Sequence, residues 1–117
     1  MEKKNDCLFC KIIERKIPAK IIYENDKVLA FHDIGPQAPV HIVIVPKSHI
    51  ERVYDLNRDN TDFWGEMVLA ANQIASDLKI KESGYRLVIN CNKDAGQAVF
   101  HLHLHLLGGR RMGWPPG

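Results

Sequence analysis

Three histidines alternate with apolar residues near the end of the chain. Residues 100–106 read Phe-His-Leu-His-Leu-His-Leu, and a period of two is typical of a half-buried β-strand. The pattern predicts that Phe100 and the three leucines point into a core, while His101, His103 and His105 share the opposite face. At ~3.3 Å per residue, neighbouring histidines on that face are spaced about 6.5–7 Å apart.

That spacing limits what the three imidazoles can do together. Zn²⁺ holds its ligand atoms at ~2.0–2.3 Å, so two adjacent rings could share one ion. The backbones of His101 and His105 would be about 13 Å apart, too far for easy convergence on one ion. We therefore expect the histidines to have separate roles. The alternative, three solvated histidines on a strand face, would leave their common register unexplained.

Two cysteines three positions apart form a second candidate site. Cys7 and Cys10 make a Cys-x-x-Cys motif at the start of an expected helix, and this spacing suits either zinc or a redox pair. No thioredoxin-like βαβ pattern surrounds the motif, which makes the redox alternative the weaker one. Two reduced, buried cysteines without a metal are the third alternative. Cys91 lies on an apolar stretch and is expected to be a core residue.

One long helix is expected among the elements that position these residues. Between residues 61 and 79 apolar side chains recur every three or four positions, and Asp59, Asn60 or Thr61 can cap the helix. The expected buried face consists of Phe63, Met67, Ala70, Ala71, Ile74 and Leu78.

Short apolar stretches between turn residues predict strands. We expect strands at residues 20–24, 27–32, 41–45, 85–91 and the histidine stretch, with a hairpin turn at Asn25-Asp26 and loops at 33–39 and 92–98. A short helix over residues 7–15, capped by Asp6 and ended by Pro18, and a helical turn within 48–56 complete the assignment. Five strands with short connections predict an α+β fold whose sheet is mostly antiparallel.

Length and composition describe an ordinary globular protein. The 117 residues are expected to form a single domain over residues 1–117 with one core. A net charge of +2 is too small to favour nucleic acid or a membrane as the main partner. No apolar run approaches the ~20 residues of a membrane span, and the polar N-terminus does not resemble a signal peptide. Three cysteines cannot all pair, which favours a reducing, cytoplasmic location.

The stretch His-Leu-His-Leu-His-Leu-Leu at residues 101–107 resembles the defining motif of the histidine triad (HIT) superfamily. Further stretches resemble its Hint branch: Phe-His-Asp-Ile at 31–34, Pro-Gln-Ala-Pro at 36–39, Gly-Gln at 96–97 and the closing Trp-Pro-Pro-Gly at 114–117. The resemblance extends from residue 7 to residue 117. It implies a HIT-like fold with one long and one short helix, and a homodimer in which two sheets join into one.

The resemblance implies catalytic roles for three histidines. His103, the middle histidine, would be the nucleophile, and a neutral imidazole suits this role because its pKa is ~6.5. His105 would contact the same phosphate or donate a proton to the departing group. His41 matches a fourth histidine of the Hint branch and would lie near the triad if the strands pair as expected; a solvated histidine at a strand start is the alternative.

The resemblance also implies a nucleotide site. Asp33 would accept hydrogen bonds from the ribose hydroxyls, although it could instead form a turn, and Asn90 and the backbone of residues 96–98 would bind the phosphate. The base would lie between Phe9, Phe31 and Ile34, which could equally be core residues. The nucleotide-binding set is therefore Phe9, Phe31, Asp33, Ile34, Asn90, Gly96, Gln97 and Ala98. Several Hint proteins carry serine where this chain has Ala98, and a methyl group cannot donate a hydrogen bond to a leaving group.

Finally, the resemblance implies a zinc site and an activity. Many bacterial HIT proteins with this Cys-x-x-Cys complete a Cys₂His₂ site, which here would use His49 and His101, and such a closed set stabilises rather than catalyses. The implied function is a purine nucleoside phosphoramidase that forms an AMP-histidine intermediate, with no organic cofactor. The alternatives are a dinucleoside polyphosphate hydrolase and a non-enzymatic nucleotide-binding module.

Overall fold

A five-stranded sheet in the order β1-β2-β3-β5-β4 forms the centre of the fold, and every neighbouring pair of strands is antiparallel. The computed structural model describes residues 6–117. Its strands are Ile21–Glu24 (β1), Val28–His32 (β2), Val40–Pro46 (β3), Tyr85–Ile89 (β4) and Leu104–Gly108 (β5). The expected α+β class is confirmed, and the sheet is wholly rather than mostly antiparallel.

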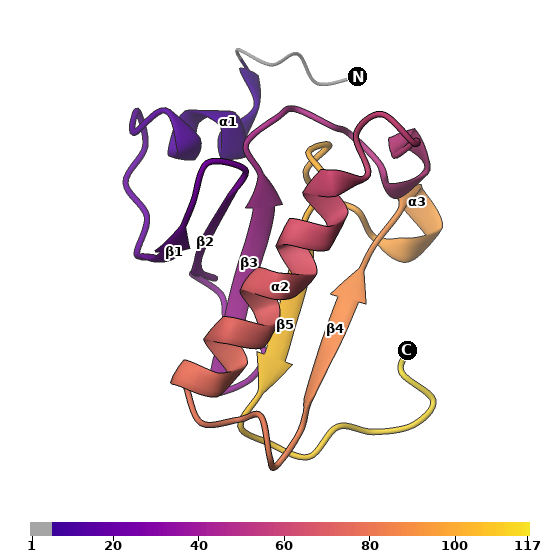
Figure 1. Ribbon diagram of the computed structural model, residues 1–117. Coiled ribbons are helices and arrows are strands. Elements are labelled where there is room, and N and C mark those ends of the chain that lie inside the picture. The colour runs from indigo at the N-terminus through magenta and orange to yellow at the C-terminus, as the bar shows by residue number, and fades with distance from the viewer. Residues whose placement is uncertain (1–5) are drawn as a thin grey trace.

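Two helices pack on opposite faces of this sheet. The long helix α2 (Asp62–Asp77) crosses one face, and the short helix α1 (Leu8–Ile13) lies near the ends of β2 and β3 (Figure 1). A second short helix, α3 (Asn92–Ala95), replaces part of the loop expected at residues 92–98, and a 3-10 turn at Val53–Asp55 falls inside the helical turn expected there. No described helix is both long and apolar enough to cross a lipid bilayer.

Strands β2 and β3 are buried on both faces because each face has its own apolar cluster. One cluster packs under α2 and the other packs against α1. On the α2 side lie Val28, Ala30, Ile42 and Ile44, and on the α1 side lie Leu29, Phe31, Val43 and Val45. The α2 face is the expected one: Met67, Ala70, Ala71 and Ile74 are buried, and Phe63 and Leu78 pack at its edge.

Strand β5 begins at Leu104, four residues later than the alternation at 100–106 predicts. The backbone before it pairs outside the sheet, since Leu102 N donates to Ile50 O and His101 O accepts from the His103 ring. The alternation of faces still holds through this irregular stretch. Leu102, Leu104 and Leu106 are buried on the α2 side. Phe100 is half-buried beneath the Arg52 guanidinium and is not a core residue.

The cap of α1 also differs from the prediction. Cys7, not Asp6, occupies the N-cap, because its Sγ accepts a hydrogen bond from Cys10 N at 3.4 Å. The helix ends at Ile13, before Arg15, whose φ of 64° is incompatible with a helix. Thr61 is the N-cap of α2 but makes no side-chain capping bond. Cys91, expected in the core, is half-buried at the N-cap of α3.

Candidate functional site

The His103 ring is held in one tautomer by the backbone of its own segment. His103 Nδ1 lies 2.7 Å from His101 O, and a carbonyl oxygen can only accept, so Nδ1 carries the proton. The lone pair is therefore on Nε2. His103 is buried, and this burial lowers its pKa, whereas the hydrogen bond to His101 O raises it. A neutral imidazole with a fixed lone pair is a nucleophile in the form that covalent catalysis requires.

A hydrogen-bonded chain fixes two further rings. The backbone N–H of Gln37 donates to His41 Nδ1 at 3.0 Å, so the proton of His41 is on Nε2. His41 Nε2 lies 2.9 Å from His105 Nδ1, which must then accept. His105 consequently carries its proton on Nε2 and can donate it to a ligand. The predicted proximity of His41 to the triad is confirmed, because β3 and β5 pair with His41 and His105 on the same face.

Both rings of this pair are neutral near pH 7. Burial lowers the pKa of His105 to about 4, and the neighbouring rings of His103 and His41 add to this effect. Burial also lowers the pKa of His41, whereas the nearby Asp33 carboxylate raises it. Asp33, His41 and His105 are close enough to surround a cation. The hydrogen bonds from Gln37 N–H to His41 and from His41 to His105 already account for the short distance between the two rings, so no cation is needed to explain it.

His41, His103 and His105 open onto a cavity of about 530 Å³. The cavity brings together most of the expected residues: Phe9, Asp33, His41, Asn90, Gly96, Ala98, His103 and His105 all line it. Gln97 does not line it, because its side chain is buried on the far side of the turn. Gly96 ends α3 with a φ of 78°, a left-handed conformation that glycine adopts without strain.

An apolar hollow of about 280 Å³ adjoins this cavity and shares Phe9 and Asp33 with it. It contains Phe31, and also Ile34, whose side chain is fully exposed. Sequence reasoning missed several of its walls, among them Leu8, Ile12, Ile17 and His32. The apolar spacing within α1 could have indicated the first two. Asp33 at the rim accepts from Gly35 N at 2.7 Å and lies 3.5 Å from His41 Nε2, so it also forms a turn.

The Cys-x-x-Cys motif and two histidines form a separate buried cluster. Cys7, Cys10, His49 and His101 each present one ligand atom, all within 4.8 Å of one another. The Nδ1 atom of His101 is 3.4 Å from Cys7 Sγ and 3.5 Å from Cys10 Sγ. The Nδ1 atom of His49 is 3.3 Å from Cys10 Sγ and 3.2 Å from the Nδ1 of His101. These four residues could hold one metal ion.

The geometry of the cluster fits a tetrahedral ion. With Zn–S of ~2.3 Å and Zn–N of ~2.05 Å, tetrahedral angles require S···N separations of ~3.5 Å and an N···N separation of ~3.3 Å. The distances above match both values. His101 Nε2 donates to Pro46 O at 2.8 Å, which leaves the His101 Nδ1 lone pair facing the cluster. Burial lowers the pKa of His101 to about 4, which favours the neutral form that binds metals.

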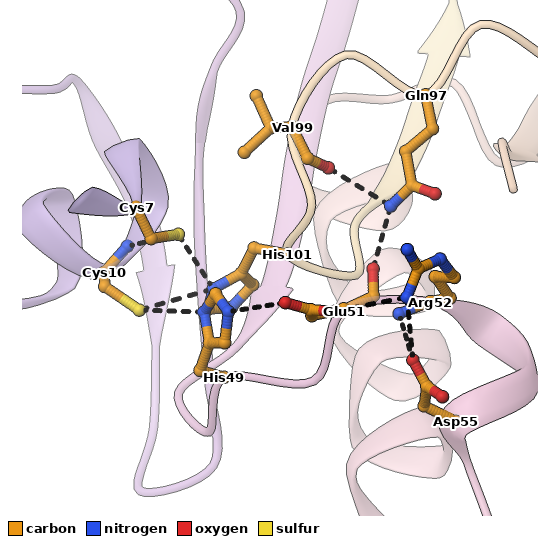
Figure 2. A network of polar contacts seen from close by, with 9 residues as sticks. All are labelled: Cys7, Cys10, His49, Glu51, Arg52, Asp55, Gln97, Val99 and His101. Carbon is orange, nitrogen blue, oxygen red and sulfur yellow. Dashed lines mark hydrogen bonds and ion pairs between the residues drawn. The ribbon is translucent and has the colours of Figure 1, made fainter. Parts of the chain in front are cut away.

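The outer nitrogen of His49 faces a carboxylate. Within residues 6–117, His49 Nε2 is buried and makes no hydrogen bond, and it lies 3.8 Å from Glu51 Oε2 (Figure 2). Metal-bound histidines commonly have a carboxylate near their other nitrogen. Glu51 was not foreseen from the sequence, because its place depends on the loop after β3 rather than on a motif.

Residues 14–112 match the model of the HIT domain family. Among curated proteins, the purine nucleoside phosphoramidase of Escherichia coli is 47% identical over 108 residues, covering 92% of this chain and 91% of the relative. A HIT-like protein of Synechocystis is 48% identical over 112 residues, covering 96% and 97%.

Solved structures match the fold closely. A HIT family hydrolase from Legionella pneumophila superposes with a TM-score of 0.92 at 50% identity, covering 95% of this chain and 99% of the other. A HIT family hydrolase from Clostridium thermocellum gives a TM-score of 0.90 at 53% identity, covering 92% and 94%.

Proposed function

The chain belongs to the HIT domain family, and on this basis we propose that it is a purine nucleoside phosphoramidase. Its substrates would be purine nucleoside 5′-monophosphates joined to a leaving group through a P–N or mixed-anhydride bond, such as adenosine phosphoramidates or aminoacyl adenylates. One observation carries the proposal: His101 O holds His103 Nδ1–H, so that the reactive lone pair is on Nε2. The identity of 47% to the E. coli phosphoramidase supports the substrate class.

In the proposed reaction His103 Nε2 attacks the α-phosphorus and the bond from phosphorus to the leaving group breaks. For a phosphoramidate the departing nitrogen takes up a proton and leaves as an amine, and AMP stays covalently bound to His103. Water then attacks the phosphorus and the bond from phosphorus to His103 Nε2 breaks, which releases AMP and restores the neutral ring. The proton that the water loses replaces the one taken up by the amine. The sum is hydrolysis of one P–N bond by one water molecule.

His105 and His41 support both steps. In the free protein His105 is neutral and its Nε2–H can donate to a phosphate oxygen, while His41 Nε2–H fixes its orientation. A bound phosphate brings negative charge next to His105, and negative charge raises the pKa of an imidazole. His105 can therefore hold a proton for the departing group while the substrate is bound.

The nucleoside would occupy the apolar hollow beside this cavity. Phe9 and Phe31 pack edge to face, with ring centroids 5.5 Å apart, and Ile34 is fully exposed for contact with the base. Asp33 stands between the hollow and the histidines, which is where a ribose would connect base and phosphate. Asn90 and the backbone of residues 96–98 would bind the phosphate from the other side of the cavity.

We further propose that the Cys7, Cys10, His49 and His101 cluster holds a structural zinc ion. The four protein ligands leave no position open for substrate, so the ion would join α1, the loop after β3 and the segment before β5. We also propose that the chain forms a homodimer. Strand β4 is an edge of the sheet within residues 6–117, and Leu87 on it and Trp114 in the tail are exposed.

A paired assay tests the activity. Wild type and His103→Ala are given an adenosine phosphoramidate and, separately, diadenosine tetraphosphate, and the quenched reaction is analysed by mass spectrometry. We expect wild type to prefer the phosphoramidate and to carry adenylate on His103. A preference for the dinucleotide would favour the other HIT activity. Binding of AMP without turnover of either compound would favour a non-enzymatic nucleotide-binding module.

A further inference from the structure

The turn that would bind phosphate is anchored by a buried glutamine amide. Gln97 lies between Gly96 and Ala98, both of which line the catalytic cavity, yet its own side chain is buried away from that cavity. Gln97 Oε1 accepts from Asn92 N at 2.9 Å. Its Nε2 donates to Val99 O at 3.1 Å and to Glu51 O at 2.8 Å. Both N–H groups of this amide are therefore satisfied within the protein, and one of them holds a distant segment.

That distant segment is the one that carries a cluster ligand. Residues 49–51 run alongside the turn, and each has a separate link: the His49 ring is in the cluster, Ile50 O accepts from Leu102 N at 2.6 Å, and Glu51 O accepts from Gln97. Figure 2 shows the Glu51 carboxylate directed toward His49 while its carbonyl faces the Gln97 amide.

Arg52 makes a second link between the same two segments. Its Nε donates to Asn92 Oδ1 at 2.6 Å, and Asn92 begins α3 at the start of the turn. The guanidinium is held over the Phe100 ring, 5.0 Å from its centroid, and its Nη1 donates to Glu51 Oε1 at 3.1 Å. The turn is thus attached to residues 51 and 52 at both of its ends.

We propose that Gln97 is a positioning residue that couples the order of the phosphate-binding turn to occupancy of the Cys7, Cys10, His49 and His101 cluster. The inference rests on the proposed function for the role of the turn. A metal ion fixes His49, the following residues fix Glu51 O, and Glu51 O fixes the Gln97 amide. Removing either the ion or the amide would loosen the same backbone, so the two losses should not add.

The test compares Gln97→Met with Gln73→Met, each with zinc bound and after chelation. Methionine has the length of glutamine but no amide, so Gln97→Met leaves Glu51 O and Asn92 N unpaired. Gln73 is an exposed glutamine of α2 whose amide donates to Asp77 Oδ1 on the same helix, which makes it the matched control. Two quantities are measured: hydrogen exchange of the peptide covering residues 92–98, and the dissociation constant of AMP.

In wild type and Gln73→Met, chelation should raise hydrogen exchange in residues 92–98 and weaken AMP binding. We expect a loss of affinity of about tenfold, the lower end of the range seen when residues that support a site are replaced. Gln97→Met should show both effects with zinc bound, and chelation should then add little. Chelation also lowers the stability of the whole chain, so exchange in α2 is the reference and should respond to chelation equally in the three proteins. If Gln97→Met does not fold, Arg52→Lys, which loses the Nε bond to Asn92, is expected to behave in the same way.

Two results would overturn the inference. In the first, Gln97→Met shows the same hydrogen exchange and AMP affinity as wild type. In the second, chelation changes Gln97→Met as much as it changes Gln73→Met. Hydrogen exchange needs no nucleotide, so it decides the coupling even if the chain does not bind AMP. A wild-type chain that neither binds AMP nor hydrolyses phosphoramidate would count against the proposed function alone.

Discussion

The backbone carbonyl of His101 lies 2.7 Å from the Nδ1 atom of His103. The ring of His101 points into the cysteine cluster, so this residue contacts the cluster with its side chain and fixes the His103 tautomer with its backbone. The two candidate sites therefore share a single residue. The two sites lie next to each other but stay separate because the histidines are two positions apart: the His101 ring enters the cysteine cluster and the His103 ring lines the cavity.

Replacing His103 with alanine should abolish catalysis without abolishing binding. The variant lacks the atom that attacks phosphorus, so we expect the rate of phosphoramidate hydrolysis to fall by at least ~10³-fold. The apolar hollow and Asp33 are unchanged, so AMP should still bind in calorimetry. Adenylated protein should be absent from the quenched reaction. Persistent adenylation in this variant would show that another residue is the nucleophile.

Replacing Cys7 with serine should remove the metal. Elemental analysis should find about one zinc per chain in wild type and in Cys91→Ser, because Cys91 lies outside the cluster. In Cys7→Ser we expect substoichiometric zinc and a Tm lower by at least ~10 °C, since binding of a structural zinc contributes several kcal/mol to folding. Equal metal content in all three proteins would contradict the site.

Stability should fall in mild acid because of His105. Its pKa is lowered to about 4 in the folded chain, against ~6.5 when unfolded. Between these values the unfolded chain binds the extra proton, so this stability is present above pH ~6.5 and is lost as the pH falls. From pH 7.5 to pH 5, wild type should lose about 2 kcal/mol more than His105→Asn in urea unfolding.

Both proteins keep the cysteine cluster, so any loss of metal in acid affects them equally. The difference between their unfolding free energies therefore reports on His105. The charged or titratable groups facing this ring are His103, His41 and Asp33, and all three are the same in both proteins. Identical pH dependence of the two unfolding free energies would mean that His105 titrates normally.

Introducing a hydroxyl at Ala98 should speed the release of amines. Ala98 is exposed and lines the same cavity as His103, so a serine there can donate to a departing nitrogen. We expect Ala98→Ser to raise kcat for phosphoramidates with poor leaving groups by about tenfold. Ala95→Ser, at the exposed end of α3, is the control. An unchanged kcat would mean that the departing group receives its proton elsewhere.

The fold could be predicted from the sequence where the signal was local. Helix α2 followed from its apolar spacing, and the β1–β2 hairpin from Asn25, whose Oδ1 accepts from the N–H groups of Lys27 and Val28. The prediction was wrong where a side chain or a remote carbonyl competed for backbone groups. Cys7 displaced Asp6 as a cap, and Ile50 O drew Leu102 N out of the sheet, which shortened β5.

For the site, the sequence by itself determined which residue types share a face. The period of two at residues 101–105 separated the histidines from the leucines, and Cys-x-x-Cys supplied two candidate metal ligands. Only the tertiary structure decided the tautomers, because backbone groups of His101, Pro46 and Gln37 set them, and every residue carries such groups. It alone placed Glu51 O against Gln97, since a contact across 46 positions leaves no local pattern.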